Sequence, residues 1–539
     1  MQIFFLKYKN MKKSILPLLF MCISGMAQAQ TAETDLKYYN MRFSLNPEEK
    51  VLSAENKIHF NVTANVKSPV TFDLNNCFDI TEIKSLSAAK KLKYEHRDNK
   101  LTIFPPVSWN DKDSISVRYK SNSEYGNGDG ITYSQHNGAP IVWTMTCPYA
   151  GGEWFVCKQD NRDKIDSITV SAECPQKYKT ASNGLLISNI EKDGKRIMTW
   201  HHRYPIDYYL ICLACTNYEI YSDFADLDDG SRVEILNMVY PEYLKEAKIE
   251  SQKLIPVFQL YCNLFGKYPF AGEKYGQAQF GWGGGMEHQT MTFVNSFDIN
   301  LTAHELSHQW FGDNITCNTW NEVWLNESFA TYCEYLTTEK GLMNEPHNWM
   351  KKTNYYATSQ SDGKIYVDYA QDFYAIFNYA TSYCKGALML HQLRQFIGNE
   401  AFMKAMKSYA TDPKLQYKTS KAADYISHVN AAAGQDMTWL FNQWLYQKGY
   451  PVYLVEWSNT ANGIQLNISQ KSSANNDNVF KMMIPVQITG AYPNEVETVW
   501  IFNDSKNQTI DIPSKFTVSK IAIDPGHETI TKQPVIIKK

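Results

Sequence analysis

The sequence of 539 residues lacks the features that mark several special classes of protein. Its formal net charge is only −3 and it has no block of like charges, so nothing favours binding to nucleic acid or to an anionic membrane surface. It has no fixed-period repeat and no low-complexity tract. Beyond residue 30, no apolar run approaches the ~18 residues that a membrane-spanning helix needs. We therefore expect neither a nucleic-acid partner nor an integral membrane span.

Cysteine is also sparse. The 11 cysteines are scattered, unlike the dense framework of a small disulfide-bonded domain. Cys212 and Cys215 occur in "CLAC", within a segment that is typical of a strand. Positions three apart on a strand face opposite sides, so we interpret this pair as part of the core and not as a metal or redox site. Cys147 and Cys157 are close in sequence, and in an exported chain they could form a disulfide.

The N-terminus has the pattern of a secretory signal peptide. Four lysines between positions 7 and 13 precede the apolar run "ILPLLFMCI", and Ala27 and Ala29 supply an A-x-A cleavage site. We expect residues 1–29 to be removed and the protein to be exported, to the periplasm or the extracellular space. The alternatives are a buried N-terminal strand and a lipid anchor on Cys22, which the bulky residues before it disfavour.

The rest of the chain is typical of a folded, multidomain protein. Its composition is 44% hydrophobic and 14% aromatic, which argues against disorder. Short alternating runs such as "KIHFNVTANV" predict an all-β domain over residues 30–236. Helical periodicity dominates residues 237–450, and alternation returns over residues 451–539, which predicts a C-terminal β-sandwich. The predicted fold class is multidomain α+β.

The segment "HELSH" carries the strongest chemical signal. His304 and His308 are four apart, so they lie on one face of a helix that we expect Gly312 to end. Two imidazoles in this arrangement can bind one zinc ion, and a catalytic zinc needs a third protein ligand and an open position. Glu327, separated from His308 by 18 residues in a second helical segment, is the candidate. A bare HExxH also arises by chance, as a polar helix face.

Glu305 lies next to the first histidine. Beside a bound metal, its carboxylate can take a proton from an attacking water and return it to the leaving amine. Otherwise it is a solvated helix carboxylate. The oxyanion that forms during such a reaction needs a further donor, and the residues alone leave several tyrosines open. These are Tyr366, Tyr369, Tyr374, Tyr379 and Tyr383.

Together these motifs resemble the gluzincin zinc aminopeptidases, which aminopeptidase N typifies. "HELSH" followed by "WLNESFATY" resembles the zinc site of that family, "GGGMEH" its G-x-M-E-N motif, and "YCKG" its Y-x-K-G stretch. The resemblance covers roughly Tyr240–Tyr450 and is mostly architectural before that. It implies a thermolysin-like catalytic domain over residues 237–450 and one Zn²⁺ per chain, with His304, His308 and Glu327 as ligands.

The resemblance also assigns roles to the other motif residues. It implies that Glu305 is the general base, that Tyr383 stabilises the oxyanion and that Glu287 binds the free α-amino group of a peptide. Gly284, Gly285 and Met286 then belong to the substrate-binding segment, where glycine allows close backbone approach and the segment can pair with an extended substrate. The alternative for this segment is a glycine-rich loop with an incidental acid.

Two positions depart from the family pattern. The asparagine after the motif glutamate is His288 here, and a second amine-binding glutamate of the N-terminal domain aligns with Cys147. Glu153 is the nearest acid that could replace it. The expected function is that of an exported zinc aminopeptidase acting on peptides. The alternatives are a zinc endopeptidase on the same site, a non-hydrolytic peptide-binding protein and a hydrolase of non-peptide substrates; the oligomeric state stays open.

Overall fold

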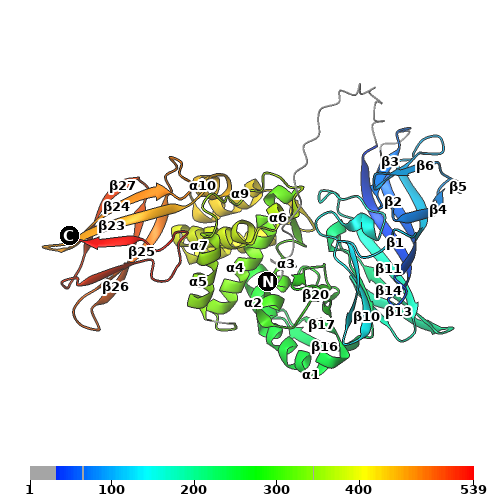
Figure 1. The fold of residues 1–539 in the computed structure, drawn as a ribbon, viewed down its shortest axis with the longest axis horizontal. Helices are drawn as coiled ribbons and strands as arrows, with labels where there is room; N and C mark the ends of the chain where they lie inside the picture. Colours follow the sequence, from blue (N-terminus) through cyan, green and yellow to red (C-terminus); the bar gives the residue numbers. More distant parts are fainter. Residues whose placement is uncertain (1–31, 63–65, 344) are drawn as a thin grey trace, which may run out of the picture.

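The computed structural model describes residues 32–62, 66–343 and 345–539. Along the long axis of the molecule, an N-terminal β-region is followed by a mostly helical region and a C-terminal β-region (Figure 1). This arrangement confirms the fold class expected from the sequence. The expected signal peptide, residues 1–29, lies outside the described residues. Within them, no helix has the length and apolar character needed to span a membrane.

The N-terminal region contains three sheets. An eight-stranded sheet has the order β13-β14-β11-β1-β2-β8-β4-β5, a four-stranded sheet the order β12-β15-β10-β9, and a three-stranded sheet the order β3-β7-β6. The strands are β1 (Thr34–Asn46), β2 (Val51–Val62), β3 (Val70–Asp73), β4 (Phe78–Ser85), β5 (Lys90–Lys91), β6 (Tyr94–Arg97), β7 (Lys100–Ile103), β8 (Lys112–Ser121), β9 (Ile131–His136), β10 (Ala139–Thr144), β11 (Ser167–Pro175), β12 (Lys179–Ser182), β13 (Leu185–Lys192), β14 (Lys195–His202) and β15 (Leu213–Thr216).

Alternation of side chains explains why these segments form strands. In β1, Met41, Phe43 and Leu45 are buried while Arg42 and Ser44 between them are exposed, as expected of a strand with one face on the core. Cys212 and Cys215 are fully buried at β15, which agrees with their interpretation as core.

The disulfide considered between Cys147 and Cys157 is wrong, because both cysteines are free. The backbone of Cys157 forms a bridge with Asp73, where the Asp73 N–H donates to the Cys157 carbonyl at 2.7 Å. The thiol of Cys147 instead lies within the electrostatic influence of Glu287 and Glu327 in the helical region. The two side chains therefore serve different parts of the core.

The helical region also contains a five-stranded sheet, with the order β16-β17-β18-β20-β19. Its strands are β16 (Glu219–Asp226), β17 (Arg232–Val239), β18 (Lys274–Gln279), β19 (Gly285–Met286) and β20 (Thr292–Val294). The boundary expected between residues 236 and 237 falls inside β17, which pairs in parallel with β18. The first two strands therefore belong with the helical region. The change of architecture precedes β16, and sequence alternation cannot reveal it because both neighbouring segments are strands.

The helices follow this sheet. They are α1 (Leu244–Glu250), α2 (Leu254–Phe265), α3 (Ile299–His308), α4 (Trp324–Glu339), α5 (Pro346–Ala357), α6 (Phe373–Ile376), the π-helix η6 (Tyr379–Lys385), α7 (Gly386–Ile397), α8 (Asn399–Ala410), α9 (Ala422–Ala433) and α10 (Thr438–Tyr446). Short 3-10 turns are η1 (Gly151–Glu153), η2 (Tyr208–Leu210), η3 (Pro241–Tyr243), η4 (Ser251–Lys253) and η5 (Trp320–Glu322), and β21 (Ile315–Cys317) pairs with β22 (Lys418–Ser420).

Helix α3 ends at His308, four residues before the expected Gly312, because the following backbone turns back and Asp313 N–H donates to the His308 carbonyl at 2.9 Å.

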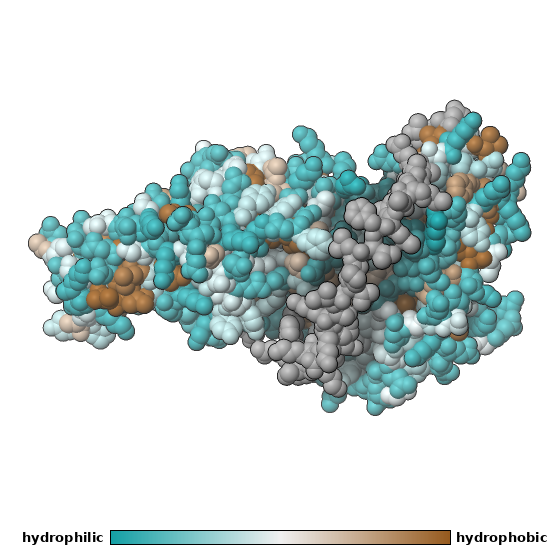
Figure 2. All heavy atoms as spheres, turned by 45° about the horizontal axis from the view of Figure 1, so that its top comes forward, coloured by the Kyte–Doolittle hydropathy of each residue, from teal (hydrophilic) through white to brown (hydrophobic). Residues whose placement is uncertain are grey.

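The C-terminal region consists of two sheets. One has the order β27-β24-β23-β29 and the other β26-β25-β28. The strands are β23 (Pro451–Thr460), β24 (Gly463–Ser472), β25 (Met482–Thr489), β26 (Val496–Asn503), β27 (Asn507–Pro513), β28 (Lys520–Ile523) and β29 (Val535–Lys538). Buried residues of both sheets, such as Trp457 and Ile484, join the main hydrophobic core. Figure 2 shows a mostly hydrophilic face, with hydrophobic residues in separate patches, the most prominent on this region.

Lys385 holds the segment that leads from the helical region into the C-terminal region. Its side chain is buried, and Nζ donates to the carbonyl of Gly363 at 2.7 Å and to that of Gly449 at 2.8 Å. The Gly449 N–H donates to the same Gly363 carbonyl at 3.2 Å. Burial lowers the pKa of Lys385 from 10.5 to about 7, since water no longer solvates the ammonium. The contact therefore depends on a lysine whose charge is unfavourable in its folded surroundings.

We predict that the stability change caused by Lys385→Met depends on pH. Between about pH 7 and 10.5 the unfolded chain holds the lysine proton and the folded chain releases it, so this group makes stability rise with pH. With the lysine neutral, its removal leaves the Gly449 carbonyl without a donor and costs about 1–3 kcal/mol. In chemical denaturation, Lys385→Met should thus lower the free energy of unfolding more near pH 10.5 than near pH 7. The exposed Lys404→Met is the control, and a loss at Lys385 that is equal at both pH values would contradict the prediction.

Candidate active site

Helix α3 carries the two histidines of the site. Its first turn is capped by Asp298, whose carboxylate accepts from the Asn300 N–H at 3.0 Å. His304 and His308 lie one turn apart, with ring centroids 4.9 Å apart and their Nε2 atoms separated by 3.2 Å. The helix period alone brings these two nitrogens together, because residues four apart share one face.

Glu327 reaches the same two nitrogens from α4. Its Oε2 lies 3.5 Å from His304 Nε2 and 3.4 Å from His308 Nε2. Among the described residues, His304, His308 and Glu327 form a group whose possible ligand atoms all lie within 4.8 Å of one another. The structure therefore brings together the three residues that the sequence singled out as metal ligands.

The geometry of these three atoms fits one metal ion. A tetrahedral ion with bonds of about 2.0–2.1 Å separates its ligand atoms by roughly 3.3 Å. The observed separations of 3.2, 3.4 and 3.5 Å lie close to that value. Two imidazole nitrogens and one carboxylate oxygen are also a donor set that binds zinc in enzymes, and it leaves a fourth position open.

Both imidazoles are oriented by their second nitrogen. His304 Nδ1 lies 2.8 Å from Glu334 Oε1, and His308 Nδ1 lies 3.0 Å from the Phe311 carbonyl. With Nδ1–H donating to these acceptors, each Nε2 directs a lone pair toward Glu327. Glu334 is itself fixed, since Trp349 Nε1–H donates to its Oε2 at 3.0 Å.

Glu334 is a functional residue that the sequence analysis missed. It follows Glu327 by seven residues on α4, which is two helical turns, so both acids lie on the same helix face. That spacing is the signal that could have identified it.

The charges of the site are strongly coupled. Burial acts to lower the pKa of His308, but Glu287 and Glu327 outweigh it and raise the pKa to about 8. Burial acts to raise the pKa of Glu327, but His308 and His304 lower it to about 2. The three groups thus form a buried site in which carboxylates stabilise positive charge, and a divalent cation can take the place of the protons.

Glu305 lies beside this group and faces an edge of the sheet. Its possible ligand atom is within 4.8 Å of those of Glu287 and His308. A Cβ at Gly285 would lie 2.3 Å from Glu305 Oε1, so glycine is needed there for the strand to pass over this carboxylate. Burial raises the pKa of Glu305 to about 8, against the opposing effect of His304 and His308.

The glycine-rich segment forms the edge strand β19. This strand pairs with β20 only, and it is the last strand of its sheet. Gly284 and Gly285 differ in their surroundings, since a Cβ at Gly284 would contact the ring of Trp282 at 2.9 Å. Met286, the second residue of β19, is buried. An edge strand at this position leaves backbone groups available to an extended ligand.

Glu287 follows β19 and is buried, with a side chain near His308 and Glu305. Its backbone is held by Gln309, the residue after α3, whose Nε2–H donates to the Glu287 carbonyl at 3.3 Å. The Gln309 Oε1 accepts from the Thr290 N–H at 3.0 Å, so one side chain clamps both ends of the turn after β19. Sequence reasoning missed Gln309, because nothing in its spacing predicts this contact.

Among the five tyrosines that the sequence left open, Tyr383 is the one next to the histidines. Its ring lies 6.2 Å from the His304 ring in a nearly parallel orientation, and its hydroxyl interacts with the Glu327 carboxylate. Burial raises the pKa of Tyr383 well above 10, and Glu327 adds to this, so the hydroxyl keeps its proton and can donate it in a hydrogen bond. Tyr369 and Tyr374 are exposed instead.

The N-terminal region does not supply Glu153 to the site. The Glu153 carboxylate accepts from the Gly130 N–H at 2.6 Å and is thereby engaged in the turn before β9. Cys147 is closer, since burial together with the charges of Glu287 and Glu327 raises the pKa of its thiol. His288 is buried against Phe293 at 4.6 Å, and burial lowers its pKa to about 3, so this residue is neutral.

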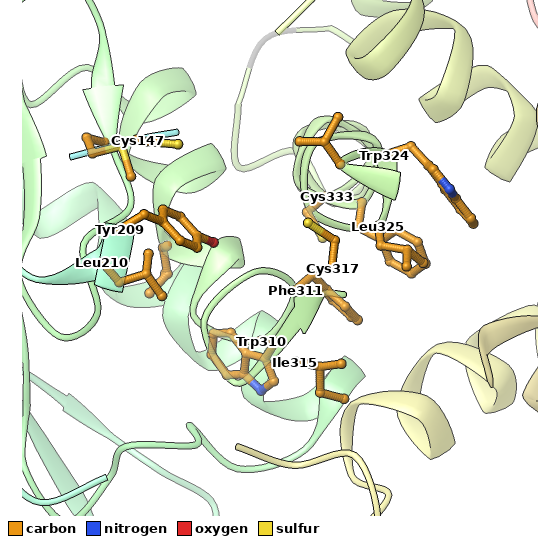
Figure 3. Packing of buried hydrophobic residues seen from close by; sticks show 14 of the residues in the cluster. Cys147, Tyr209, Leu210, Trp310, Phe311, Ile315, Cys317, Trp324, Leu325 and Cys333 are labelled. Carbon is orange, nitrogen blue, oxygen red and sulfur yellow. The ribbon is translucent and has the colours of Figure 1, made fainter. Parts of the chain in front are cut away.

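Apolar packing holds the elements of the site in register. Figure 3 shows side chains that follow α3 (Trp310, Phe311 and Ile315) and side chains of α4 (Trp324, Leu325 and Cys333) in one cluster, which Cys147 and Tyr209 approach from the N-terminal region. The Tyr209 hydroxyl donates to the Gly312 carbonyl at 3.2 Å and accepts from Asn326 Nδ2 at 3.1 Å. The N-terminal region thus braces the end of α3 and the residue before Glu327.

Comparisons with known proteins agree with this geometry. Residues 284–444 match the model of the peptidase family M1 domain. The chain is 24% identical over 439 residues to "Probable aminopeptidase 1" of Sulfurisphaera tokodaii, covering 76% of this chain and 54% of the relative. It is 33% identical over 165 residues to aminopeptidase N of Lactococcus lactis subsp. lactis, covering 29% of this chain and 19% of the relative. The chain spans about half the length, or less, of the curated relatives it matches.

The fold agrees with solved structures. The M1 zinc metallopeptidase of Deinococcus radiodurans superposes with a TM-score of 0.66 at 20% identity, covering 78% of this chain and 95% of that one. A mutant of the same enzyme bound to a Tyr-Ser-Ala substrate gives a TM-score of 0.67 at 19% identity, covering 78% and 96%. Residues 284–444 thus match the peptidase family M1 domain, and over this segment the chain is similar to gluzincin-type, aminopeptidase N-like proteins.

Proposed function

We propose that this chain is an exported zinc aminopeptidase that removes N-terminal residues from peptides. The observation that carries the proposal is the triangle of His304 Nε2, His308 Nε2 and Glu327 Oε2, with separations of 3.2–3.5 Å, beside a free sheet edge. The M1 zinc metallopeptidase of Deinococcus radiodurans, which shares the fold, binds a tripeptide substrate. No ligand or base is lost from the set, which disfavours a protein that only binds peptides.

The three ligands would hold one zinc ion per chain. When bound, zinc would supply Lewis acidity. It would polarise a peptide carbonyl and lower the pKa of a water molecule, so that this water can lose a proton and attack near neutral pH. The contacts of the two Nδ1 atoms would support zinc binding, because Glu334 and the Phe311 carbonyl accept from Nδ1 and leave each Nε2 to the metal.

Glu305 is the proposed general base. Its carboxylate accepts the proton of the attacking water and returns it to the nitrogen of the leaving amine. It is buried against Gly285, so the side chain has little freedom to turn away from the substrate strand. Across the site, the Tyr383 hydroxyl donates a hydrogen bond to the oxyanion that forms at the attacked carbonyl.

Glu287 is the proposed receptor for the substrate α-amino group. It is buried next to the base, and a bound ammonium could donate charge-assisted hydrogen bonds to its carboxylate. The edge of β19 can pair with the substrate backbone and hold the first peptide bond between Glu287 and the metal ligands. This arrangement favours cleavage after the first residue over cleavage within a chain.

Export is part of the proposal and is supported by the sequence of residues 1–29 alone. The lysines, the apolar run and the A-x-A site together form a signal peptide pattern. The natural substrates would then be peptides in the periplasm or outside the cell.

The experiment that tests the proposed activity compares unblocked aminoacyl amides with their N-acetylated forms. We predict cleavage of the free amines and a rate about 10–100-fold lower for the acetylated forms, because acetylation removes the charged hydrogen bond to Glu287. Glu287→Gln should reduce kcat/KM for the free amines by a similar factor. The ratio of the rates for free and acetylated substrates should then be smaller than in the parent protein. Glu305→Gln should abolish hydrolysis of both. Equal cleavage of both substrate forms would reject an aminopeptidase and retain a peptidase, whereas unchanged hydrolysis by Glu305→Gln would reject the catalytic site.

A second prediction concerns zinc binding. Glu334→Ala should weaken zinc affinity about 10–100-fold, because His304 loses the acceptor that fixes its ring and tautomer. Competition with a chromogenic chelator measures this affinity. The matched control is Glu339→Ala, which removes an exposed acid from the end of the same helix. Equal affinities for the two variants would show that the contact between His304 and Glu334 does not support the metal site.

The third prediction concerns export. Expressed with its full N-terminus in a Gram-negative host, the protein should be recovered outside the cytoplasm, with a mass that corresponds to cleavage near Ala29. Leu18→Arg, which interrupts the apolar run, should keep the chain in the cytoplasm at full mass. A parent protein of full mass in the cytoplasm would contradict the proposal.

A further inference from the structure

Helix α4 passes close to the start of α7, which directly follows the π-helix η6, at Ser328 and Gly386. A Cβ at Gly386 would lie 1.7 Å from Ser328 Oγ and 2.6 Å from Ser328 Cβ, so no other residue fits at this position while the serine keeps its place. The backbone of Gly386 has a φ of −66° and a ψ of −41°, which any residue adopts. The glycine is therefore required by the approach of the two helices and not by its backbone conformation.

Beside this contact, a hydrogen bond joins α4 to η6. Ser328 Oγ–H donates to the Ser382 carbonyl at 2.7 Å, and both serines are fully buried. Ser328 directly follows Glu327 along α4, and Ser382 directly precedes Tyr383 along η6. One side chain thus connects the neighbour of a metal ligand to the neighbour of the oxyanion donor.

The helix that carries Tyr383 needs such support. A π-helix has a wider turn than an α-helix, and it is rare and frequently found at functional sites. Ser382 Oγ–H donates to the Ile376 carbonyl at 2.8 Å, and Asn378 caps the first turn by accepting from the Ala380 N–H at 3.1 Å. These contacts are local to the segment around η6. The hydrogen bond from Ser328 links the backbone of this segment to α4.

We propose that Ser328 is a positioning residue, whose hydrogen bond to Ser382, with Gly386 leaving it room, fixes the Tyr383 hydroxyl relative to Glu327. This inference rests on the proposed peptidase function, in which Tyr383 acts on the oxyanion. The oxyanion forms only after attack on the carbonyl. A displaced tyrosine therefore stabilises the transition state less and leaves substrate binding unchanged. Substitution of Ser328 should therefore lower kcat and leave KM unchanged.

Four variants of the full chain test this position. Ser328→Ala should lower kcat about tenfold through loss of one buried hydrogen bond, with KM, zinc content and Tm close to the parent. Gly386→Ala should lower kcat about 100-fold, since the added Cβ forces the helices apart. The double variant Gly386→Ala with Ser328→Gly removes the clash and should recover kcat to the level of Ser328→Ala. Thr338→Val, which removes a buried hydroxyl elsewhere on α4, should keep the parent kcat.

A double-mutant cycle with Tyr383→Phe distinguishes positioning from a purely structural role. If Ser328 acts through Tyr383, Ser328→Ala causes no further loss of kcat once the tyrosine hydroxyl is absent. The inference would be overturned if the losses of kcat from Ser328→Ala and Tyr383→Phe multiplied in the double variant. It would also be overturned if Ser328→Ala changed KM or zinc content in place of kcat, or if the Gly386 and Ser328 double variant recovered no kcat. A Tyr383→Phe variant with the parent kcat would overturn it in a different way, by rejecting the proposed role of Tyr383 itself.

Discussion

Three atoms from two helices determine what this molecule can do. His304 Nε2, His308 Nε2 and Glu327 Oε2 lie 3.2–3.5 Å apart in buried surroundings, at separations that suit ligands of one ion. Without a cation, two imidazoles and a carboxylate at such distances are stable only if protons are shared between them, which explains the opposite pKa shifts of His308 and Glu327. The site thus stabilises a positive charge, and the neighbouring groups can act on a ligand that binds to this charge.

Each of the other features supports this triangle or uses it. Glu334 and the Phe311 carbonyl orient the imidazoles, and Tyr209 of the N-terminal region braces the turn after α3. Gln309 connects that same turn to the backbone of Glu287, so one hydrogen bond ties the end of α3 to the proposed amine receptor. The contact between Ser328 and Ser382 does the same for Tyr383. The reacting groups are held on helices and on a strand edge, with few degrees of freedom left to loops.

The sequence predicted those features that depend on local spacing. The two histidines of the HELSH segment lie on one helical face because residues four apart in a helix share a face. Alternating patterns also predicted the two β-regions. The site residues were found through their motif, but Tyr383 could be chosen among five tyrosines only through resemblance to a family. Its ring against His304 supplies the physical reason.

Features that depend on distant contacts could not be predicted. The boundary expected at residue 236 falls inside β17, which pairs with β18 across 34 intervening residues. Gln309 and the Ser328 contact join segments that only the fold brings together. Glu334 is an intermediate case, since its spacing of seven residues from Glu327 was visible but had no meaning before the His304 ring was placed.

The central claim is tested most directly by locating the metal. Crystals of the protein loaded with one equivalent of zinc should show a single anomalous peak at the zinc absorption edge. We expect the ion within about 2.0–2.2 Å of His304 Nε2, His308 Nε2 and a Glu327 oxygen. No peak between these atoms, or a peak bound by other residues while these three stay apart from it, would contradict the account.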